Sequence, residues 1–171
     1  MQIPTLPTAV FSTCDFCDEH KLDDSGSFQV LPPVFHDFGG LVAFSGVIST
    51  VKCYEDNSLV KVAVDSPGNG RVLVIDGGAS LRCALVGGNL AATASRNGWA
   101  GLLVNGCVRD VAELKASPIG IRALALMPLP TEKRNQGLRD VAVRIQGVLV
   151  HPGEWLYADA DGIVISASSL L

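Results

Sequence analysis

The residues best suited to chemistry follow the apolar segment Leu102–Val108. That segment ends abruptly in Arg109-Asp110, and Glu113 stands three residues on, so the two acids share one face of a short predicted helix. A guanidinium binds a carboxylate through two parallel hydrogen bonds, and an aspartate is a ligand for hard divalent cations. The pattern indicates either a site for an organic acid and a metal ion, or a local ion cluster in which Asp110 caps the helix.

A glycine pair supplies a second candidate element. The segment Gly87-Gly88-Asn89-Leu90 follows a short apolar run and opens a predicted helix. Free N–H groups at a helix N-terminus favour a phosphate or carboxylate, and glycine allows close approach of the ligand. A plain turn is the alternative, because the spacing matches neither the phosphate-binding loop nor the dinucleotide fingerprint. A similar pair, at residues 76–78, follows the strand predicted at Arg71–Ile75.

The cysteines and histidines carry weaker signals. Cys14 and Cys17 form a CxxC pattern, but the sequence shows neither a thioredoxin-like strand before it nor a second cysteine pair for zinc. We therefore interpret the cysteines as reduced thiols that are mostly buried. His36 and His151 are interpreted as structural. Trp99, Trp155 and Tyr157 are expected in the core or in a subunit interface. Residues 159–162 are expected to form a tight turn.

The elements that must position these residues alternate along the middle of the chain. Helix and strand patterns succeed one another there, which predicts parallel βαβ units covered on both faces, and the last forty residues read as a strand-rich tail. A polar, mobile loop is expected at Thr131–Arg139. The predicted strands are Ser45–Cys53, Arg71–Ile75, Gly101–Val104, Ile121–Leu126, Val141–Val143, Val148–Val150 and Ile163–Ser166. The predicted helices are 8–20, with Thr8 as N-cap, Asn57–Val64, Gly88–Asn97 and Asp110–Lys115.

Composition limits the class of protein. The 171 residues (17.9 kDa) are 48% hydrophobic and 18% charged, which excludes intrinsic disorder and predicts a single domain over residues 1–171. A net charge of −4 argues against nucleic-acid binding. No apolar run approaches the ~20 residues that span a bilayer, and the first fourteen residues lack the basic region of a signal peptide. We expect a soluble, cytoplasmic protein.

Taken together, these segments resemble the RraA-like family, which comprises the regulators of ribonuclease activity A and the metal-dependent 4-hydroxy-4-methyl-2-oxoglutarate aldolases. The aldolase branch is marked by a glycine, twenty residues, Arg-Asp, two residues and an acid, and this spacing is met by Gly88, Arg109, Asp110 and Glu113. Further matching segments are 38–40, 50–53, 55–57, 71–78, 84–86, 97–101, 108–110 and 156–159.

The resemblance implies an α/β/α sandwich of the swivelling-domain kind, assembled as a homotrimer or a dimer of trimers with active sites between subunits. It also implies roles for the candidate residues. The loop Gly87-Gly88-Asn89-Leu90 and Arg109 would bind the pyruvoyl end of a 2-oxo acid. Asp110 would coordinate Mg²⁺ or Mn²⁺, and Glu113 would either support that ligand from behind or reach the metal through a water molecule. Longer aldolases of the family carry a C-terminal extension toward a neighbour's site, whereas this chain ends at Leu171.

The residues agree with such a reaction. Retro-aldol cleavage of a 2-oxo-4-hydroxy acid leaves a pyruvate enolate, which a metal ion and Arg109 would stabilise. None of the five lysines follows a strand end beside the glycine loop, which favours a metal over a lysine Schiff base. Oxaloacetate decarboxylation passes through the same enolate and is expected as a second activity, with a metal-bound water or hydroxide as the base in aldol cleavage.

Two alternatives stay open at this stage. In the first, the chain is a regulator that binds and inhibits ribonuclease E through protein–protein contact, and Arg109 and Asp110 have no catalytic role. The short length resembles these regulators, but they tend to lack an aspartate after the arginine, and Asp110 is present here. Alternatively, it would catalyse another metal-assisted reaction of 2-oxo acids.

Overall fold

The computed structural model describes residues 10–171, and four parallel strands form its centre. They are adjacent in the order in which they occur in the chain, and nearly all their residues are buried. Long runs of Val, Leu and Ile are typical of parallel strands that are covered on both faces. These strands are β3 (Phe44–Lys52), β4 (Val72–Asp76), β6 (Gly101–Val108) and β7 (Gly120–Leu126).

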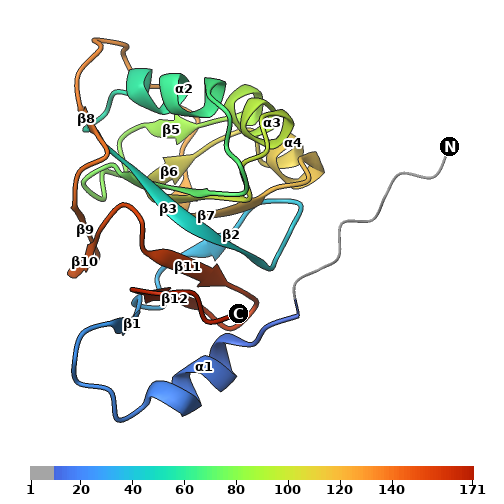
Figure 1. Ribbon diagram of the computed structural model, residues 1–171. Helices are drawn as coiled ribbons and strands as arrows, with labels where there is room; N and C mark the ends of the chain where they lie inside the picture. Colours follow the sequence, from blue (N-terminus) through green and yellow to red (C-terminus); the bar gives the residue numbers. More distant parts are fainter. Residues whose placement is uncertain (1–9) are drawn as a thin grey trace, which may run out of the picture.

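Three helices connect these strands and cover one face of the sheet (Figure 1). They are α2 (Ser58–Asp65), α3 (Gly88–Arg96) and α4 (Val111–Ala116). Their inward side chains join the sheet in one apolar cluster that includes Val60 and Leu114. The predicted βαβ alternation is confirmed, and it brings the carboxyl ends of β4 and β6 to the same edge of the sheet.

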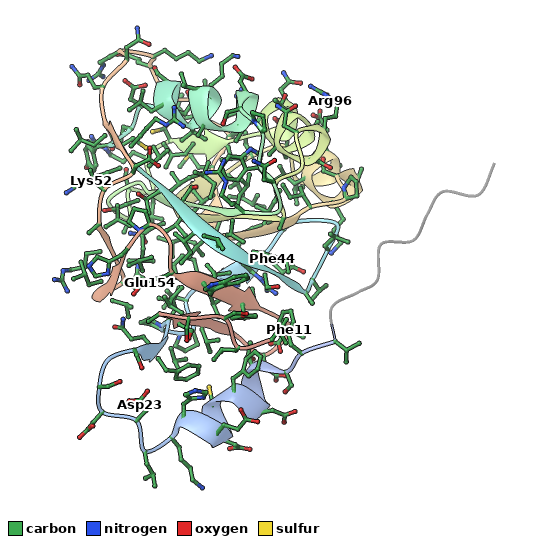
Figure 2. All side chains as sticks on the ribbon, viewed as in Figure 1. Phe11, Asp23, Phe44, Lys52, Arg96 and Glu154 are labelled. Carbon is green, nitrogen blue, oxygen red and sulfur yellow. The ribbon has the colours of Figure 1, made fainter. Side chains whose placement is uncertain are left out.

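The opposite face of the sheet is covered by further strands. The first half of β3 pairs with β11, and its second half pairs with β4, so the sheet bends at β3. Phe44 packs at this bend among apolar residues of both layers (Figure 2). The strands of this layer are β11 (Trp155–Ala158), β12 (Ile163–Ser166), β1 (Phe28–Val30), and the hairpin of β9 (Val143–Ile145) and β10 (Val148–Val150).

Outside these strands lies α1 (Thr13–His20), so two layers of strands separate two layers of helices (Figure 1). The predicted mixed α/β fold with a strand-rich C-terminal part is confirmed. Asp159, in the tight turn between β11 and β12, accepts a hydrogen bond from the Thr13 hydroxyl at 2.7 Å and holds α1 in place. None of the described helices has the length and hydropathy needed to cross a bilayer.

Several boundaries differ from the predictions. The helix expected from residue 8 begins at Thr13, because Ser12 is extended and its hydroxyl accepts the Asp15 N–H as N-cap. The predicted cap, Thr8, lies outside the described residues. The strand expected at Val141–Val143 lies two residues later. Strands β1 and β11, together with β2 (His36–Asp37), β5 (Ala84–Val86) and β8 (Leu138–Arg139), were not predicted because they are too short to show alternation.

The cysteines behave as expected of unreactive thiols. All five are free, and Cys53, Cys83 and Cys107 are buried, whereas Cys14 is exposed. The pKa of Cys14 is raised chiefly by the charge of Asp161, and burial raises the pKa of Cys53 to about 12. Because the thiolate is the nucleophile, these surroundings do not favour redox chemistry.

Two of the three aromatic residues singled out by the sequence are buried. Trp99 lies under α2, where its indole N–H donates to the Ser66 carbonyl at 3.1 Å, and Tyr157 is fully buried between β11 and α1. Trp155 is half-buried and stacks on Tyr157. The expected place of these residues in the core is confirmed for Trp99 and Tyr157.

Candidate functional site

The site begins where β6 ends. Asp110 has φ 63° and ψ 50°, in the left-handed region that residues other than glycine rarely adopt. This conformation turns the chain sharply from β6 into α4. The Asp110 side chain makes no capping bond to α4, so the alternative of a simple helix cap is wrong. Its Oδ2 instead accepts the backbone N–H of Gly88 at 3.0 Å, and the strained backbone thereby aims the carboxylate at the start of α3.

The glycine pair is required by close packing against α4. A Cβ atom at Gly87 would lie 2.7 Å from Asp110 Oδ2, and one at Gly88 would collide with the carboxylate of Glu113. The absence of both side chains lets the acids of α4 approach the backbone of α3. The Glu113 side chain therefore occupies space that any residue larger than glycine at position 88 would need.

Arg109 stands beside this pair with much of its guanidinium free. Its Nε lies 3.9 Å from Asp110 Oδ2, and its Nη1 donates a long bond of 3.4 Å to the Pro128 carbonyl. The side chains of Arg109 and Asp110 are 40% and 39% exposed, respectively. A guanidinium with such sparse protein partners keeps donors available for a carboxylate or a carbonyl oxygen.

A cleft of about 290 Å³ collects these groups. The predicted residues that line it are Gly87, Asn89, Leu90, Arg109 and Asp110. The Gly88 N–H donates to Asp110, whereas the N–H groups of Asn89 and Leu90 have no carbonyl acceptor within α3 and are available to an anion at the mouth of the helix. Gly88 and Glu113 lie behind this lining. The structure thus brings the predicted residues together.

The cleft also contains residues that the sequence did not reveal, among them Asn57, Lys61, Thr131 and Lys133. They come from the start of α2 and from the segment before β8. Chain separation hid them, because Asn57 and Thr131 lie 74 residues apart and meet only in the fold. Their mixture of amide, hydroxyl and ammonium groups makes this part of the cleft polar and positively charged.

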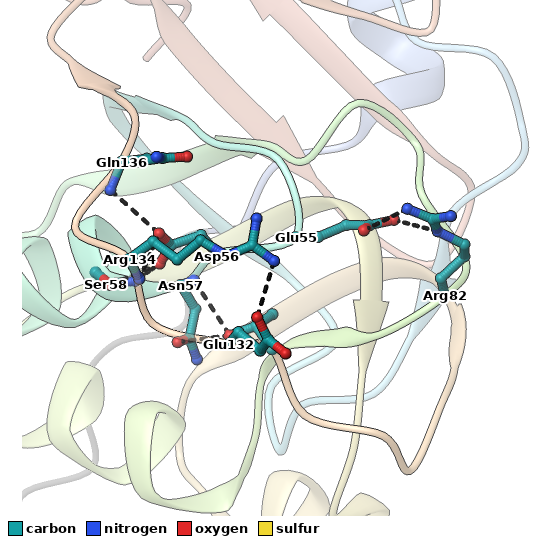
Figure 3. Close-up of polar contacts among 9 residues, drawn as sticks. Glu55, Asp56, Asn57, Ser58, Arg82, Glu132, Arg134 and Gln136 are labelled. Carbon is teal, nitrogen blue, oxygen red and sulfur yellow. Dashed lines mark hydrogen bonds and ion pairs between the residues drawn. The ribbon is translucent and has the colours of Figure 1, made fainter.

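The segment that carries Thr131 is tied down by two residues at the start of α2 (Figure 3). Asp56 Oδ2 accepts the N–H groups of Arg134 and Gln136 at 2.9 and 3.1 Å. The Thr131 hydroxyl donates to Asn57 Oδ1 at 2.9 Å. The loop expected to be mobile at Thr131–Arg139 is therefore anchored by hydrogen bonds, which its polar composition did not reveal.

Lys61 and Lys133 both line the cleft, although neither directly follows a strand end. Residue order hid them, since Lys61 lies inside a helix and Lys133 in a distant loop. Lys61 is exposed and donates to Asp65 at 2.6 Å, and Lys133 is also exposed. A Schiff-base lysine is activated by an apolar pocket or a neighbouring cation. Lys61 has an acidic partner instead, so its surroundings do not favour that route.

The donor set suits a cation that keeps most of its water. Within residues 10–171, no three His, Cys, Asp or Glu side chains are grouped so that they could hold a metal ion by themselves. Mg²⁺ commonly binds through one or two carboxylates and retains several waters. Asp110, exposed in the cleft and with one oxygen uninvolved in the bond to Gly88, fits that mode of binding.

Two other parts of the structure are weaker candidates for a chemical site. The glycine pair after β4 is closed on itself, because buried Asp76 accepts the Gly78 N–H at 2.9 Å and the Asn105 amide at 3.3 Å. A larger hollow of about 330 Å³ adjoins it, lined by Lys52, Tyr54 and Leu138 among others. That hollow is mostly apolar and has no guanidinium, so the smaller cleft is the better candidate for chemistry.

The fold and the cleft define a class: mixed α/β proteins with an Arg-Asp pair facing a glycine-opened helix at the carboxyl edge of a parallel sheet. The chain belongs to the RraA-like family, described as Aldolase/RraA, which matches residues 13–165. This assignment agrees with the resemblance carried by Gly88, Arg109, Asp110 and Glu113.

The relatives carry several functional names. A protein of Albidiferax ferrireducens named "Putative 4-hydroxy-4-methyl-2-oxoglutarate aldolase" is 62% identical and covers 96% of this chain and 99% of its own. The RNA-processing inhibitor RraA from Thermus thermophilis is 42% identical, with a TM-score of 0.89 over 95% of this chain and 96% of its own. A Geobacillus kaustophilus structure titled S-adenosylmethionine:2-dimethylmenaquinone methyltransferase is also 42% identical, with a TM-score of 0.86 over 94% and 97%. Proteins with all three functional names share this fold, so the fold alone does not define the reaction.

Proposed function

We propose that this protein is a divalent-metal-dependent aldolase that cleaves 4-hydroxy-4-methyl-2-oxoglutarate, and similar 2-oxo-4-hydroxy acids, to release pyruvate. The observation that carries the proposal is the bond from the Gly88 N–H to Asp110, made by a strained aspartate at the end of a core strand. This bond joins the Arg-Asp pair to the anion-binding start of α3 in one cleft. The aldolase name of the 62% identical relative supports the same reaction.

Asn89, Leu90 and Arg109 bind different parts of the 2-oxo acid in this proposal. The N–H groups of Asn89 and Leu90 receive the 1-carboxylate of the 2-oxo acid, because they stand free at the start of α3. The guanidinium of Arg109 lies beside the 2-oxo oxygen. The C4 hydroxyl releases its proton to solvent, and its oxygen becomes the carbonyl of a second pyruvate as the C3–C4 bond breaks. The electron pair of that bond forms the enolate of the first pyruvate, and the negative charge develops on the 2-oxo oxygen next to the guanidinium. Protonation at C3 then yields pyruvate.

A divalent cation held by Asp110 would supply Lewis-acid stabilisation of the same developing charge. Asp110 is fixed for this purpose by its bond to Gly88. Glu113 lies against Gly88 and adds negative charge behind the aspartate. Oxaloacetate gives the same enolate when it loses carbon dioxide, so its decarboxylation is proposed as a second activity.

The test is pyruvate release from 4-hydroxy-4-methyl-2-oxoglutarate and from oxaloacetate, with Mg²⁺ or Mn²⁺ and then with EDTA. We expect release from both substrates that stops with EDTA and returns when metal is restored. Arg109→Lys is a useful companion, since it keeps the charge but loses the planar fork of donors. Release that persists in EDTA would exclude the metal-dependent mechanism.

A regulator of RNA processing is the second candidate. The similarity to the RNA-processing inhibitor RraA, at a TM-score of 0.89, favours it. In this case the protein would bind ribonuclease E by protein–protein contact, and its own cleft would not matter. Asp110→Asn separates the two, because it should abolish pyruvate release but leave inhibition of ribonuclease E unchanged.

A further inference from the structure

The cleft is lined by one lysine that has no acidic partner among the described ion pairs. Lys61 is engaged by Asp65, and Glu132 is engaged by Arg134 at 3.0 Å. Lys133 therefore contributes an uncommitted ammonium group to the lining of the cleft. An exposed lysine can bind a ligand at a defined position only when the loop that carries it is held in place.

The loop is held at both sides of Lys133. On the N-terminal side, Thr131 exchanges two contacts with Asn57: its hydroxyl donates to Asn57 Oδ1 at 2.9 Å and receives the Asn57 N–H at 3.3 Å. On the C-terminal side, the N–H groups of Arg134 and Gln136 donate to Asp56. Glu132 and Lys133 lie between these two attachments, and the Glu132 carboxylate is engaged by Arg134.

Asn57 also connects this loop to the glycine segment. Its side-chain N–H donates to the Leu85 carbonyl at 3.0 Å, two residues before Gly87. One amide therefore sets the distance between the loop that carries Lys133 and the segment that begins the anion site. Asp56 and Asn57 form, with the Thr131 hydroxyl and the N–H groups of Arg134 and Gln136, what we term the loop clamp.

We propose that the loop clamp positions Lys133 to bind the second carboxylate of a dicarboxylic 2-oxo acid, so that Lys133 determines specificity and Asn57 and Thr131 are positioning residues. This inference rests on the proposed function. The glycine segment and Arg109 take the pyruvoyl end, and Lys133, which lines the same cleft from the loop before β8, supplies a cation for the other carboxylate. A point charge on a flexible stem suits a single carboxylate, provided that the stem begins at a fixed place.

The test compares two substrates that differ only at that carboxylate. The first is 4-hydroxy-4-methyl-2-oxoglutarate, and the second is 4-hydroxy-4-methyl-2-oxopentanoate, in which a methyl group replaces it. Both break the same C3–C4 bond and release pyruvate. The measured quantity is the ratio of their kcat/KM values, determined for the full chain with Mg²⁺.

Lys133→Met keeps the length of the side chain but removes its charge. We expect it to lower the ratio about tenfold, mainly through a higher KM for the dicarboxylate. Lys133→Arg should restore most of the ratio. Lys21→Met, an exposed lysine at the end of α1, is the matched control and should leave the ratio unchanged.

The clamp is tested by Thr131→Val, which removes the hydroxyl at constant size, against Thr131→Ser, which keeps it. We expect the valine variant to lower the ratio in the same direction as Lys133→Met, and the serine variant to retain it, with melting temperatures showing that both fold. An unchanged ratio in Lys133→Met, or equal losses on both substrates, would overturn this inference alone. No pyruvate from either substrate with wild-type protein would overturn the proposed function, and the inference with it.

Discussion

Asp110 combines two properties that a substitution can separate, its charge and its left-handed backbone. Asparagine tolerates that backbone and keeps an oxygen for the Gly88 N–H, so Asp110→Asn should melt within a few degrees of wild type. Pyruvate release should fall at least about 100-fold, because the carboxylate for the cation is lost. Asp110→Ala should in addition lose about 1–2 kcal/mol of unfolding free energy, since it removes the bond and strains the backbone. Equal melting and full turnover in the asparagine variant would contradict the role proposed for Asp110.

Asp56 gives a prediction about pH. Its burial raises the pKa of the carboxyl, but hydrogen bonds from Ser58, Gln136 and Arg134 outweigh that effect and lower the pKa to about 2. A carboxyl whose pKa is lower in the folded state stabilises the protein above its unfolded pKa near 3.9, and this stability is lost as pH falls toward 2.

Asp56→Asn should therefore cost about 1–3 kcal/mol at pH 7, because the amide cannot accept all four bonds. The difference in unfolding free energy from wild type should narrow as pH falls from 4 to 2. Urea unfolding at several pH values measures it, and Asp24→Asn, in the exposed loop after α1, is the control. A difference in unfolding free energy that widens in acid would contradict a lowered pKa of Asp56 in the folded protein.

Residues close in the sequence could be predicted as parts of the site, and residues joined only by the fold could not. Gly88, Arg109 and Asp110 were recognised because each stands at the end of an apolar strand or the start of a helix. Thr131 and Lys133 gave no such signal, because a polar loop looks the same whether it is free or clamped. The buried carboxylate of Asp56 and the side chain of Asn57 hold that loop, and both contacts exist only in the tertiary structure.

Among the elements, the bend of β3 depends on small residues at the starts of β6 and β7. A Cβ atom on either Gly101 or Gly120 would collide with the ring of Phe44. Gly120→Ala should therefore destabilise the protein by about 1–3 kcal/mol, or about 2–4 °C in melting temperature for each kcal/mol.

Phe44→Leu should cost stability alone but relieve the collision, so the double variant should lose less than the sum of the two single losses. Gly162→Ala, where a methyl group meets nothing within 4 Å, is the control. Strictly additive losses would show that the ring and the glycine do not interact.

The element types themselves were predictable where they are long. The parallel strands and α2–α4 follow from apolar runs separated by helical periodicity, and the structure confirms them. The second layer of strands was only partly predicted. Strands β1 and β11 have only three and four residues and are defined by their pairing with β12. No local sequence pattern predicts that pairing.

At the scale of the whole molecule, the cleft continues into an exposed apolar surface. Val111 and Leu126 are each 49% exposed, and they line a shallow hollow with Arg109, Asp110 and Pro128. Leu129, 60% exposed, lies in the segment that follows β7. Apolar side chains gathered beside a charged site are typical of a surface that another protein covers. We predict that a second copy of the chain, as in the trimer that the family resemblance implies, covers this surface and completes the cleft.

Leu126→Glu should therefore prevent assembly, because it would move a charged carboxylate from water into an apolar contact. Val62→Glu is the matched control, since Val62 has the same 49% exposure but lies on α2, outside the cleft and its apolar border. Sedimentation of both variants beside wild type gives the assembly state, and pyruvate release gives the activity. We expect trimers for wild type and Val62→Glu, and smaller species without activity for Leu126→Glu. If Leu126→Glu sediments as wild type does, the neighbouring subunit does not cover this surface, and the cleft must bind its substrate within one chain.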